Sequence, residues 1–546
     1  MDKLLKLAEK MIRSIEERRI SFWVLLSSFA SLIIIRVLVE NMAAGENSHK
    51  GVLTFYEFFD SFAIAYLLSL WIIHKMLAVD FRRAANILIV GYSVIIIPPI
   101  VDYIMSHGKG FLSFYTFDGF AGLVKRFFTF FGDRPDIGIT YGVRAEILIA
   151  VILILIYSYL KSKNILKSIL TSLSVYLVLF LLGTFPSWIT IAVEGISKGF
   201  LRITGIDAVQ MFFSPFSLFS REINSVNDAL ITRVNMIYIL LLTAILLLAF
   251  WKYQKIKLYS FLRNIRAPQI SFHLGLLSIG LGAGILLSET TVSINFFNVL
   301  GFLVLSEAVI FSWLASVVVN DIFDKKVDTI ANPNRPFIKK DFSLLEYKSL
   351  GIILFALSIY LSFLINPKIS FFLIAYQAIA WAYSAWPFRL KRFAFVSTFI
   401  SALALILIFF SGYILASPSQ NLFGLPASII IFLIFAYTFS IPLKDFKDIE
   451  GDKADGVYTV PVVFGEYWGK IIVSSGIFIS FLASILVFNE FRLFWWALIL
   501  GGISFWLVNK MKKNPAESKI NYRNIFWWIL GTISIYGLIL IKIIFS

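Results

Sequence analysis

Two groups of aspartates with the same spacing stand at the ends of strongly apolar segments. Both follow the pattern i, i+3, i+7: Asp321, Asp324 and Asp328 in NDIFDKKVD, and Asp445, Asp448 and Asp452 in KDFKDIEGD. This spacing predicts that the carboxylates of each group lie on one helical face and converge on a cation. Because every candidate ligand atom is oxygen, we expect the cation to be Mg²⁺.

Paired acidic groups beside a membrane suit the chemistry of an allylic diphosphate. Mg²⁺ ions held by such groups can bridge the diphosphate oxygens and stabilise the charge that develops as the carbon–oxygen bond breaks. Nearby cationic side chains could bind phosphate oxygens directly, and the candidates are Arg335, Arg389, Lys391 and Lys444. An apolar tunnel between helices would accept the isoprenoid chain.

The elements that must position these residues are those of a membrane protein. Hydrophobic residues make up 59% of the chain and charged residues 15%, which is far from the balance of soluble proteins. Apolar runs long enough to cross about 30 Å of hydrocarbon recur along the chain. We therefore expect an all-α, polytopic bundle of transmembrane helices in the cell membrane.

Hydropathy predicts nine spans from Phe272 onward and about six before it. The nine are 272–288, 297–320, 347–365, 369–386, 394–416, 426–443, 470–488, 491–508 and 524–544. The six are 21–39, 60–78, 84–105, 145–160, 166–185 and 236–251, of which the first reads as a signal anchor. Two longer outer segments, about 106–144 and 186–235, could hold re-entrant or interfacial helices.

The loops of the C-terminal nine spans alternate between strongly basic and nearly uncharged. The loops after even-numbered spans carry the basic residues, whereas the other side offers only Lys368 and Arg492. The positive-inside rule therefore places both aspartate groups on the cytoplasmic side. We put a domain boundary in the basic stretch 251–268, giving membrane domains of residues 1–255 and 256–546. The equal placement of the two groups hints at an ancient duplication.

Several other classes of site are excluded or disfavoured. The chain has no cysteine, so disulfides and zinc–thiolate sites are absent. We interpret the scattered residues His49, His74, His107 and His273 as ordinary interface or loop residues. The net charge of +16 arises from short loops rather than one soluble face, so we expect no nucleic-acid partner.

The segment from about residue 266 to residue 545 resembles the UbiA-type intramembrane prenyltransferases. Asn320–Asp328 fits that family's first motif, NDxxDxxxD, and ANPNRPFIKKDFS continues as the family does. YSAWPFRLKR, from Tyr383 to Arg392, is similar to the family's middle cytoplasmic loop. KDFKDIEGD followed by GVYTVPVVFG resembles its second acidic motif.

The resemblance implies a nine-helix UbiA-like domain with a central cavity, Mg²⁺-dependent ionisation of a prenyl diphosphate, and attack by an acceptor on the allylic cation. All six aspartates would bind metal, and Asp321, Asp324, Asp445 and Asp448 would be catalytic. Asn320 would orient the first site. The residues expected to bind the diphosphate are Asn320, Arg335, Tyr383, Arg389, Lys391 and Lys444.

The expected partners are a prenyl diphosphate, a hydrophobic or amphipathic acceptor, and the lipid bilayer. The motifs describe only the diphosphate half of the site, so a lipid or an aromatic acceptor remains open.

Other functions compete with this interpretation. One is transfer of a phosphoribosyl group to polyprenyl phosphate, and another is ion-coupled transport. Transporters usually place their acids near the membrane midplane, whereas these stand at span ends. A third is loss of activity, although neither aspartate group lacks a residue. The six N-terminal spans match no family that we recognise, and we hypothesise that they bind or translocate the lipid product.

Overall fold

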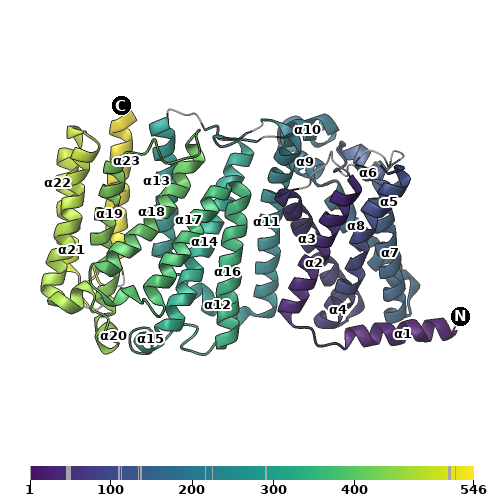
Figure 1. The fold of residues 1–546 in the computed structure, drawn as a ribbon, viewed down its shortest axis with the longest axis horizontal. Coiled ribbons are helices and arrows are strands. Elements are labelled where there is room, and N and C mark those ends of the chain that lie inside the picture. The colour runs from purple at the N-terminus through teal and green to yellow at the C-terminus, as the bar shows by residue number, and fades with distance from the viewer. Residues whose placement is uncertain are drawn as a thin grey trace. The chain divides into compact units, whose positions relative to one another are not determined.

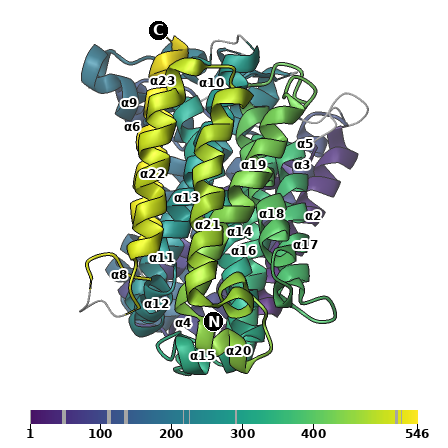
Figure 2. The same ribbon diagram turned by 90° about the vertical axis from the view of Figure 1, so that its left-hand side faces the viewer.

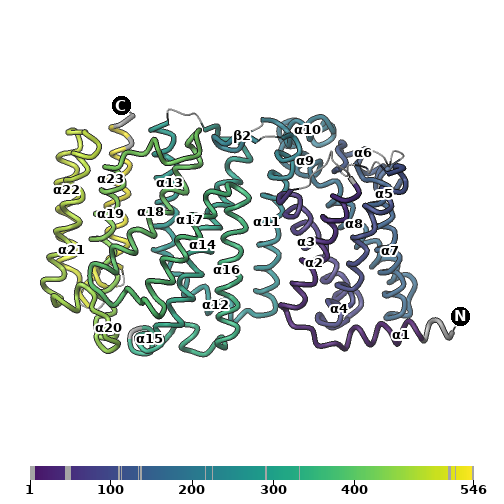
Figure 3. The backbone as a smooth tube through the Cα atoms, viewed as in Figure 1, coloured from purple at the N-terminus to yellow at the C-terminus, as the bar shows by residue number. Residues whose placement is uncertain are grey.

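The computed structural model describes the chain except residues 1, 45–50, 109–110, 112–113, 133–134, 136–137, 216, 224, 289–291, 514–517, 523 and 546, so His49 lies outside the described residues. Nearly all its elements are helices (Figure 1, Figure 3). In the described part, 13 helices are long and apolar enough to cross a membrane. The prediction of an all-α, multi-pass membrane protein is confirmed.

Contacts group the chain into two compact units. The first comprises Met1–Ser217 with Ile223–Leu248, and the second comprises Leu218–Glu222 with Ala249–Ser546. A five-residue segment therefore belongs to the second unit although its neighbours in sequence belong to the first. This segment includes most of a small hairpin formed by β1 (Ser217–Leu218) and β2 (Arg221–Glu222).

The first unit contains all six predicted N-terminal spans. Its elements are α1 (Asp2–Glu16), α2 (Phe22–Ala44), α3 (Val52–Leu77), α4 (Phe81–Gly91), η2 (Tyr92–Ile96), α5 (Ile97–Met105), α6 (Phe120–Phe128), α7 (Tyr141–Ser162), α8 (Ile165–Gly183), α9 (Phe185–Lys198), η3 (Phe200–Arg202), α10 (Gly205–Phe213) and most of α11 (Val226–Tyr253). The spans are α2, α3, the run from α4 to α5, α7, α8 and α11. The two longer segments that the sequence predicts to lie outside, 106–144 and 186–235, hold the short helices α6, α9 and α10.

Helix α1 lies across the ends of the other helices of its unit (Figure 1). Its apolar and charged residues separate onto opposite faces, which is the pattern of an interfacial helix. The buried carboxylate of Glu16 fixes its end, because it accepts hydrogen bonds from Tyr157 Oη (2.8 Å) and Lys161 Nζ (2.6 Å) on α7.

The second unit contains helices at all nine predicted C-terminal spans. Its elements are α12 (Lys255–Arg263), α13 (Ala267–Ser288), α14 (Phe296–Phe323), α15 (Lys325–Ala331), α16 (Leu344–Ile365), α17 (Pro367–Ser384), η4 (Leu390–Arg392), α18 (Val396–Ala416), α19 (Ala427–Ser440), η5 (Ile441–Lys447), α20 (Ile449–Ala454), α21 (Val460–Val487), η6 (Phe491–Leu493), α22 (Phe494–Lys510) and α23 (Ile525–Phe545). Of the nine, α17 and α23 fall outside the 13 candidate spans. Lys368 and Gln377 make α17 the more polar of these two.

Small residues bring α13 and α18 into backbone contact. A Cβ at Gly280 would lie 2.1 Å from the Phe409 carbonyl oxygen, and one at Gly412 would lie 2.0 Å from that of Leu277. Such close approach is how helices pack in a membrane, where no hydrophobic force drives them together. This contact fixes two walls of the cavity described below.

The two short helices α15 and α20 lie side by side at one end of the second unit (Figure 1, Figure 2). Each follows a longer membrane helix through a single non-helical residue, Asp324 or Asp448. The aspartate groups therefore lie at the same end of the bundle.

Candidate active site

The two aspartate groups share one local architecture, but it is not the one that their spacing predicts. In each group the first residue ends a membrane-embedded helix, the second stands at a junction, and the third lies in a short helix: Asp321, Asp324 and Asp328 across α14 and α15, and Asp445, Asp448 and Asp452 across η5 and α20. The junction residues have φ/ψ of −95°/17° and −107°/6°. The expectation of one continuous helical face is wrong, because the helix breaks within each group.

One side chain joins the two groups. Asn332, which follows α15, donates hydrogen bonds from Nδ2 to Asp328 Oδ1 (3.2 Å) and to Asp448 Oδ1 (3.3 Å). An amide that reaches a carboxylate of each group places both groups in a single site.

Asp321 is the most heavily bonded of the six carboxylates. It is 1% exposed and accepts hydrogen bonds at Oδ1 from Arg266 (2.8 Å) and Arg335 (2.8 Å). Its Oδ2 accepts from Asn264 (2.7 Å) and Tyr347 (2.9 Å). Four donors from three segments of the unit therefore converge on one buried anion.

Asp328 shares the guanidinium of Arg335 with Asp321. Burial raises the pKa of Asp328 to about 6, and the charge of Arg335 opposes this rise. Desolvation thus outweighs the ion pair, as expected for a carboxylate removed from water.

A second set of cations holds Asp324. The Lys391 ammonium forms an ion pair with its Oδ1, and Arg389 Nη2 lies 3.6 Å from the same oxygen. Arg389 also pairs with Asp455, the residue that follows α20. Burial lowers the pKa of Lys391 to about 8. The basic loop 389–392 is therefore part of the site.

The second group has fewer cationic partners. Asp448 lies 4.0 Å from Lys447 and accepts the bond from Asn332, while Asp452 accepts from Thr459 (3.4 Å). Among the described residues, no side chain donates a hydrogen bond to Asp445. Burial, followed by repulsion from Asp445 and Asp448, raises the pKa of Asp452 to about 8. The carboxylates of this group therefore form fewer direct ion pairs than those of the first group.

The carboxylates form no ready-made metal cage. Within the described ranges, no group of three or more Asp, Glu or His side chains is close enough to hold an ion. In the first group, arginine and lysine side chains form ion pairs with the carboxylates. The donor chemistry still fits Mg²⁺, because all six side chains offer oxygen and those of the second group form few direct ion pairs.

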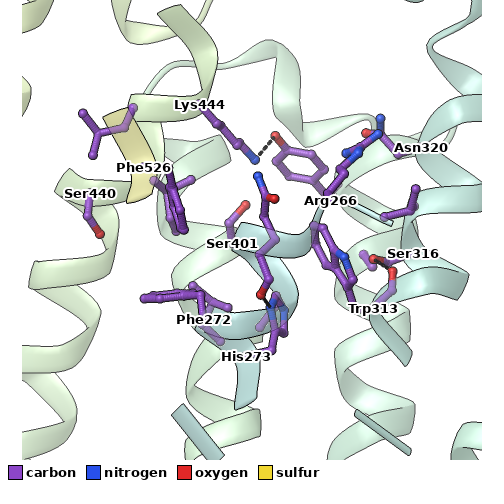
Figure 4. Close-up of a pocket in the computed structure, with 18 of the residues that line it drawn as sticks. Arg266, Phe272, His273, Trp313, Ser316, Asn320, Ser401, Ser440, Lys444 and Phe526 are labelled. Carbon is purple, nitrogen blue, oxygen red and sulfur yellow. Dashed lines mark hydrogen bonds between the residues drawn. The ribbon is translucent and has the colours of Figure 1, made fainter. Parts of the chain in front are cut away.

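A pocket opens beside these groups and extends between the membrane helices of the second unit (Figure 4). Arg266, Asn320 and Lys444 lie at one end, and His273 and Trp313 lie at the other. The remaining wall is predominantly aromatic and aliphatic: Phe272, Val317, Ile379, Ala380, Ala404, Leu405, Ile441, Leu443, Phe526, Ile529, Leu530 and Ile533. The pocket thus has a charged mouth and an apolar interior, as an amphiphile with an anionic head requires.

Hydrogen bonds fix the polar side chains of this pocket. Lys444 Nζ donates to Tyr383 Oη (3.3 Å, dashed in Figure 4). Ser384 donates to Asn320 Oδ1 (3.2 Å), so Asn320 is oriented by a serine and faces the pocket. His273 Nε2 and Tyr376 Oη lie 3.0 Å apart, which makes this histidine a buried pocket residue.

All the residues expected to bind a diphosphate lie at this site: Asn320, Tyr383 and Lys444 line the pocket, while Arg335, Arg389 and Lys391 contact the aspartates. Sequence reasoning missed Asn264, Arg266, Tyr347 and Asp455, and it gave no role to Asn332, which lies in the motif ANPNRPFIKKDFS. Arg266 stood in the basic stretch interpreted as a boundary, and the available signal was that this stretch is predicted to lie on the same side of the membrane as the aspartate groups. Tyr347 had none.

Comparison with known proteins identifies related sequences for the C-terminal part. Residues 276–530 match the model of the UbiA prenyltransferase family. The chain is 31% identical over 176 residues to a digeranylgeranylglyceryl phosphate synthase of Sulfolobus acidocaldarius, covering 32% of this chain and 62% of that protein. It is 28% identical over 234 residues to the protein of that name in Thermococcus sibiricus, covering 40% and 80%.

Among solved structures, a UbiA homologue from Archaeoglobus fulgidus bound to GPP and Mg²⁺ is 22% identical, covering 52% of this chain and 99% of that one with a TM-score of 0.40. The chain spans about three fifths of the length of the first relatives it matches, 62% in each case.

Proposed function

Because residues 276–530 match the model of the UbiA prenyltransferase family, we propose that this protein is an intramembrane, Mg²⁺-dependent prenyltransferase. It would move an isoprenoid group from a prenyl diphosphate to a hydrophobic or amphipathic acceptor. Two relatives are named digeranylgeranylglyceryl phosphate synthases, so a glyceryl phosphate lipid is the first acceptor that we would test.

The observation that carries this proposal is the bridge formed by Asn332. Two acidic groups far apart in sequence meet at one amide, directly beside a pocket with a charged mouth and an apolar interior. Carboxylates at a shared site are needed to hold metal against a diphosphate. A transporter would not need them at the end of its helices.

The six aspartates would hold the metal: Asp321, Asp324, Asp328, Asp445, Asp448 and Asp452. When bound, Mg²⁺ supplies charge neutralisation for the departing diphosphate. The chain's own cations contribute as well, because an entering diphosphate offers Arg335, Arg389 and Lys391 an alternative anion to the aspartates that they now contact.

The apolar interior would hold the isoprenoid chain and exclude water from the allylic carbon. Aromatic faces such as those of Phe272, Trp313 and Phe526 line this space, and the negative face of an aromatic ring stabilises a nearby cation. Lys444 and Arg266, at the mouth, would hold the diphosphate end.

We further propose that residues 256–546 form the catalytic domain and residues 1–255 a separate membrane domain. The grouping of Ala249–Ser546 with Leu218–Glu222 supports this division. We place the protein in the cell membrane with the site toward the cytoplasm, because the loops of that end hold most of the basic residues.

The test is diphosphate release by the purified protein in nanodiscs, supplied with geranylgeranyl diphosphate, Mg²⁺ and a membrane-lipid extract. We expect release that stops on chelation with EDTA, together with a prenylated lipid detected by mass spectrometry. Absence of release with donors of every chain length, from folded protein, would refute the proposal.

A further inference from the structure

Asp455 is a buried carboxylate beside the site that belongs to neither aspartate group. It follows α20 directly, and its backbone N–H donates to the Gly451 carbonyl oxygen (3.1 Å). Its side chain is 11% exposed and forms an ion pair with the buried guanidinium of Arg389. A carboxylate so far removed from water is stable only with a partner of this kind. The pair is therefore built into the site.

The backbone around Asp455 fixes the position of this carboxylate. Gly456 has a φ of 69°, which is the left-handed conformation that often ends a helix. Two residues further on, the Tyr458 N–H donates to the Arg392 carbonyl oxygen (3.0 Å). The turn after α20 is thus joined to the basic loop 389–392 by a backbone hydrogen bond as well as by the ion pair.

Arg389 is placed between two carboxylates. Its Nη2 pairs with Asp455 and lies 3.6 Å from Asp324 Oδ1. Its φ of 44° is left-handed, which is unfavourable for a residue with a Cβ, so the side-chain contacts have a backbone cost to offset. Arg389 Nε is buried and donates to none of the described residues, which leaves it to a phosphate oxygen or to water.

Only one of these two carboxylates is a proposed metal ligand. Asp324 Oδ1 also contacts the Lys391 ammonium, so Arg389, Lys391 and an arriving Mg²⁺ compete for one oxygen. A doubly charged ion at Asp324 repels both cationic side chains at close range. Asp455 is not in either aspartate group, and its charge stays with Arg389 when the metal is bound.

Resting on the proposed function, we infer that Asp455 is the positioning residue that keeps Arg389 in the site after Mg²⁺ has taken Asp324. The guanidinium then changes from sharing two carboxylates to holding one carboxylate and one diphosphate oxygen. Asp455 touches neither metal nor substrate and acts only through Arg389. Its loss weakens binding of the diphosphate and leaves the metal site intact.

The test measures the affinity for inorganic diphosphate directly, by calorimetry on the full-length protein in nanodiscs with saturating Mg²⁺. Asp455→Asn keeps the size of the side chain and removes its charge, whereas Asp455→Glu keeps the charge. The matched control is Glu450→Gln, which makes the same chemical change on α20 in an exposed carboxylate that pairs with Lys513.

In Asp455→Asn the dissociation constant of inorganic diphosphate should rise roughly 10-fold, the lower end of what a charge-assisted hydrogen bond contributes. KM for geranylgeranyl diphosphate should rise equally, while the Mg²⁺ concentration for half-maximal activity stays unchanged. Asp455→Glu should recover most of the affinity, and Glu450→Gln should match the wild type.

Unchanged or tighter diphosphate binding in Asp455→Asn overturns the inference, because Asp455 then gives Arg389 no support or competes with the ligand for it. A higher Mg²⁺ requirement in this variant overturns it as well, because the carboxylate then serves the metal.

A second comparison tests whether Asp455 acts through Arg389. Once Arg389→Gln has removed the cation, adding Asp455→Asn should weaken diphosphate binding by less than about 2-fold more, whereas independent sites would give losses that multiply. Multiplying losses contradict the inference. The Arg389→Gln variant also serves if Asp455→Asn does not fold, because wild-type affinity there would remove the group that Asp455 is inferred to hold.

Failure of the proposed function is a separate result. In that case the wild-type protein releases diphosphate from no prenyl donor, whatever the variants show with inorganic diphosphate.

Discussion

Replacing one carboxylate oxygen by an amide nitrogen should affect stability in the first acidic group and leave it nearly unchanged in the second. Asp321 accepts four hydrogen bonds, two of them from arginines, at 1% exposure. Asp445 receives no side-chain hydrogen bond from the described residues and lies near both Lys444 and Asp448. We therefore expect Asp321→Asn to lose both activity and stability, and Asp445→Asn to lose activity alone.

The magnitude follows from the partners. In Asp321→Asn, the new amide nitrogen faces either the two arginines or the pair formed by Asn264 and Tyr347, so two buried donors lose their acceptor in either orientation. Breaking a buried ion pair costs about 3–5 kcal/mol, and one carbonyl oxygen remains, so we expect a loss of about 3 kcal/mol. Asp445→Asn leaves no side-chain hydrogen-bond donor of the described residues without its acceptor, and it removes attraction to Lys444 together with repulsion from Asp448. It should therefore change the free energy of unfolding by less than about 0.5 kcal/mol.

Both variants should lose more than about 100-fold in kcat, because even outer partners of metal ligands contribute 10- to 100-fold. The assay pairs Mg²⁺-dependent diphosphate release with equilibrium unfolding in detergent. Equal stability of the two variants would refute the assignment of Asp321 as a structural anion. Retained turnover in Asp445→Asn would remove that carboxylate from the metal site.

Three further tests concern the Asn332 bridge between the aspartate groups, an exposed ion pair of Lys513, and the pH dependence of Mg²⁺ binding. Asn332→Leu should raise the Mg²⁺ concentration for half-maximal activity by about 10-fold, since the groups lose their shared amide; an unchanged Mg²⁺ titration would contradict this. Lys513→Ala removes an ion pair to Glu450 whose side chains are 70% and 72% exposed, so kcat and stability should stay as in the wild type. A large loss of kcat there would mean that the site is misplaced. Because the pKa of Asp452 is raised to about 8 and protons compete with metal, the apparent Mg²⁺ affinity should rise from pH 6 to pH 8 and then level off. Asp452→Asn should flatten this rise, as measured from Mg²⁺ titrations of activity at each pH.

The membrane spans could be predicted because length and apolarity alone decide whether a segment crosses lipid. The residues at which the spans begin and end could not be predicted in the same way. The sixth predicted span starts at 236, whereas α11 begins at Val226, since Asp228 and Arg233 interrupt the apolar pattern. Arg233 is nevertheless buried and donates to the carbonyl oxygens of Phe212 and Ser214. Only the tertiary structure provides those acceptors.

The site was predictable as far as its motifs extend. The spacing of the aspartates marked the carboxylates correctly as neighbours, but it also indicated a single helical face, which the junctions at Asp324 and Asp448 rule out. The partners of Asp321 come from segments with no motif, such as Tyr347 on α16. A hydrogen bond between distant segments leaves no local trace in sequence, so these residues required the structure.

The hairpin segment Leu218–Glu222 has a consequence for the synthesis of this protein. Phe219 N–H donates to Asn298 (2.8 Å), Arg221 to the Ile365 carbonyl (2.9 Å), and Ser220 Oγ to that of Leu415 (2.8 Å), at separations of 79, 144 and 195 residues. A ribosome therefore delivers the hairpin long before α14, α16 and α18 enter the membrane. The first residues of the second unit are therefore synthesised within the sequence of the first unit, before the helices that they contact. The hydrogen bonds of the hairpin cannot all form until α18 has been synthesised.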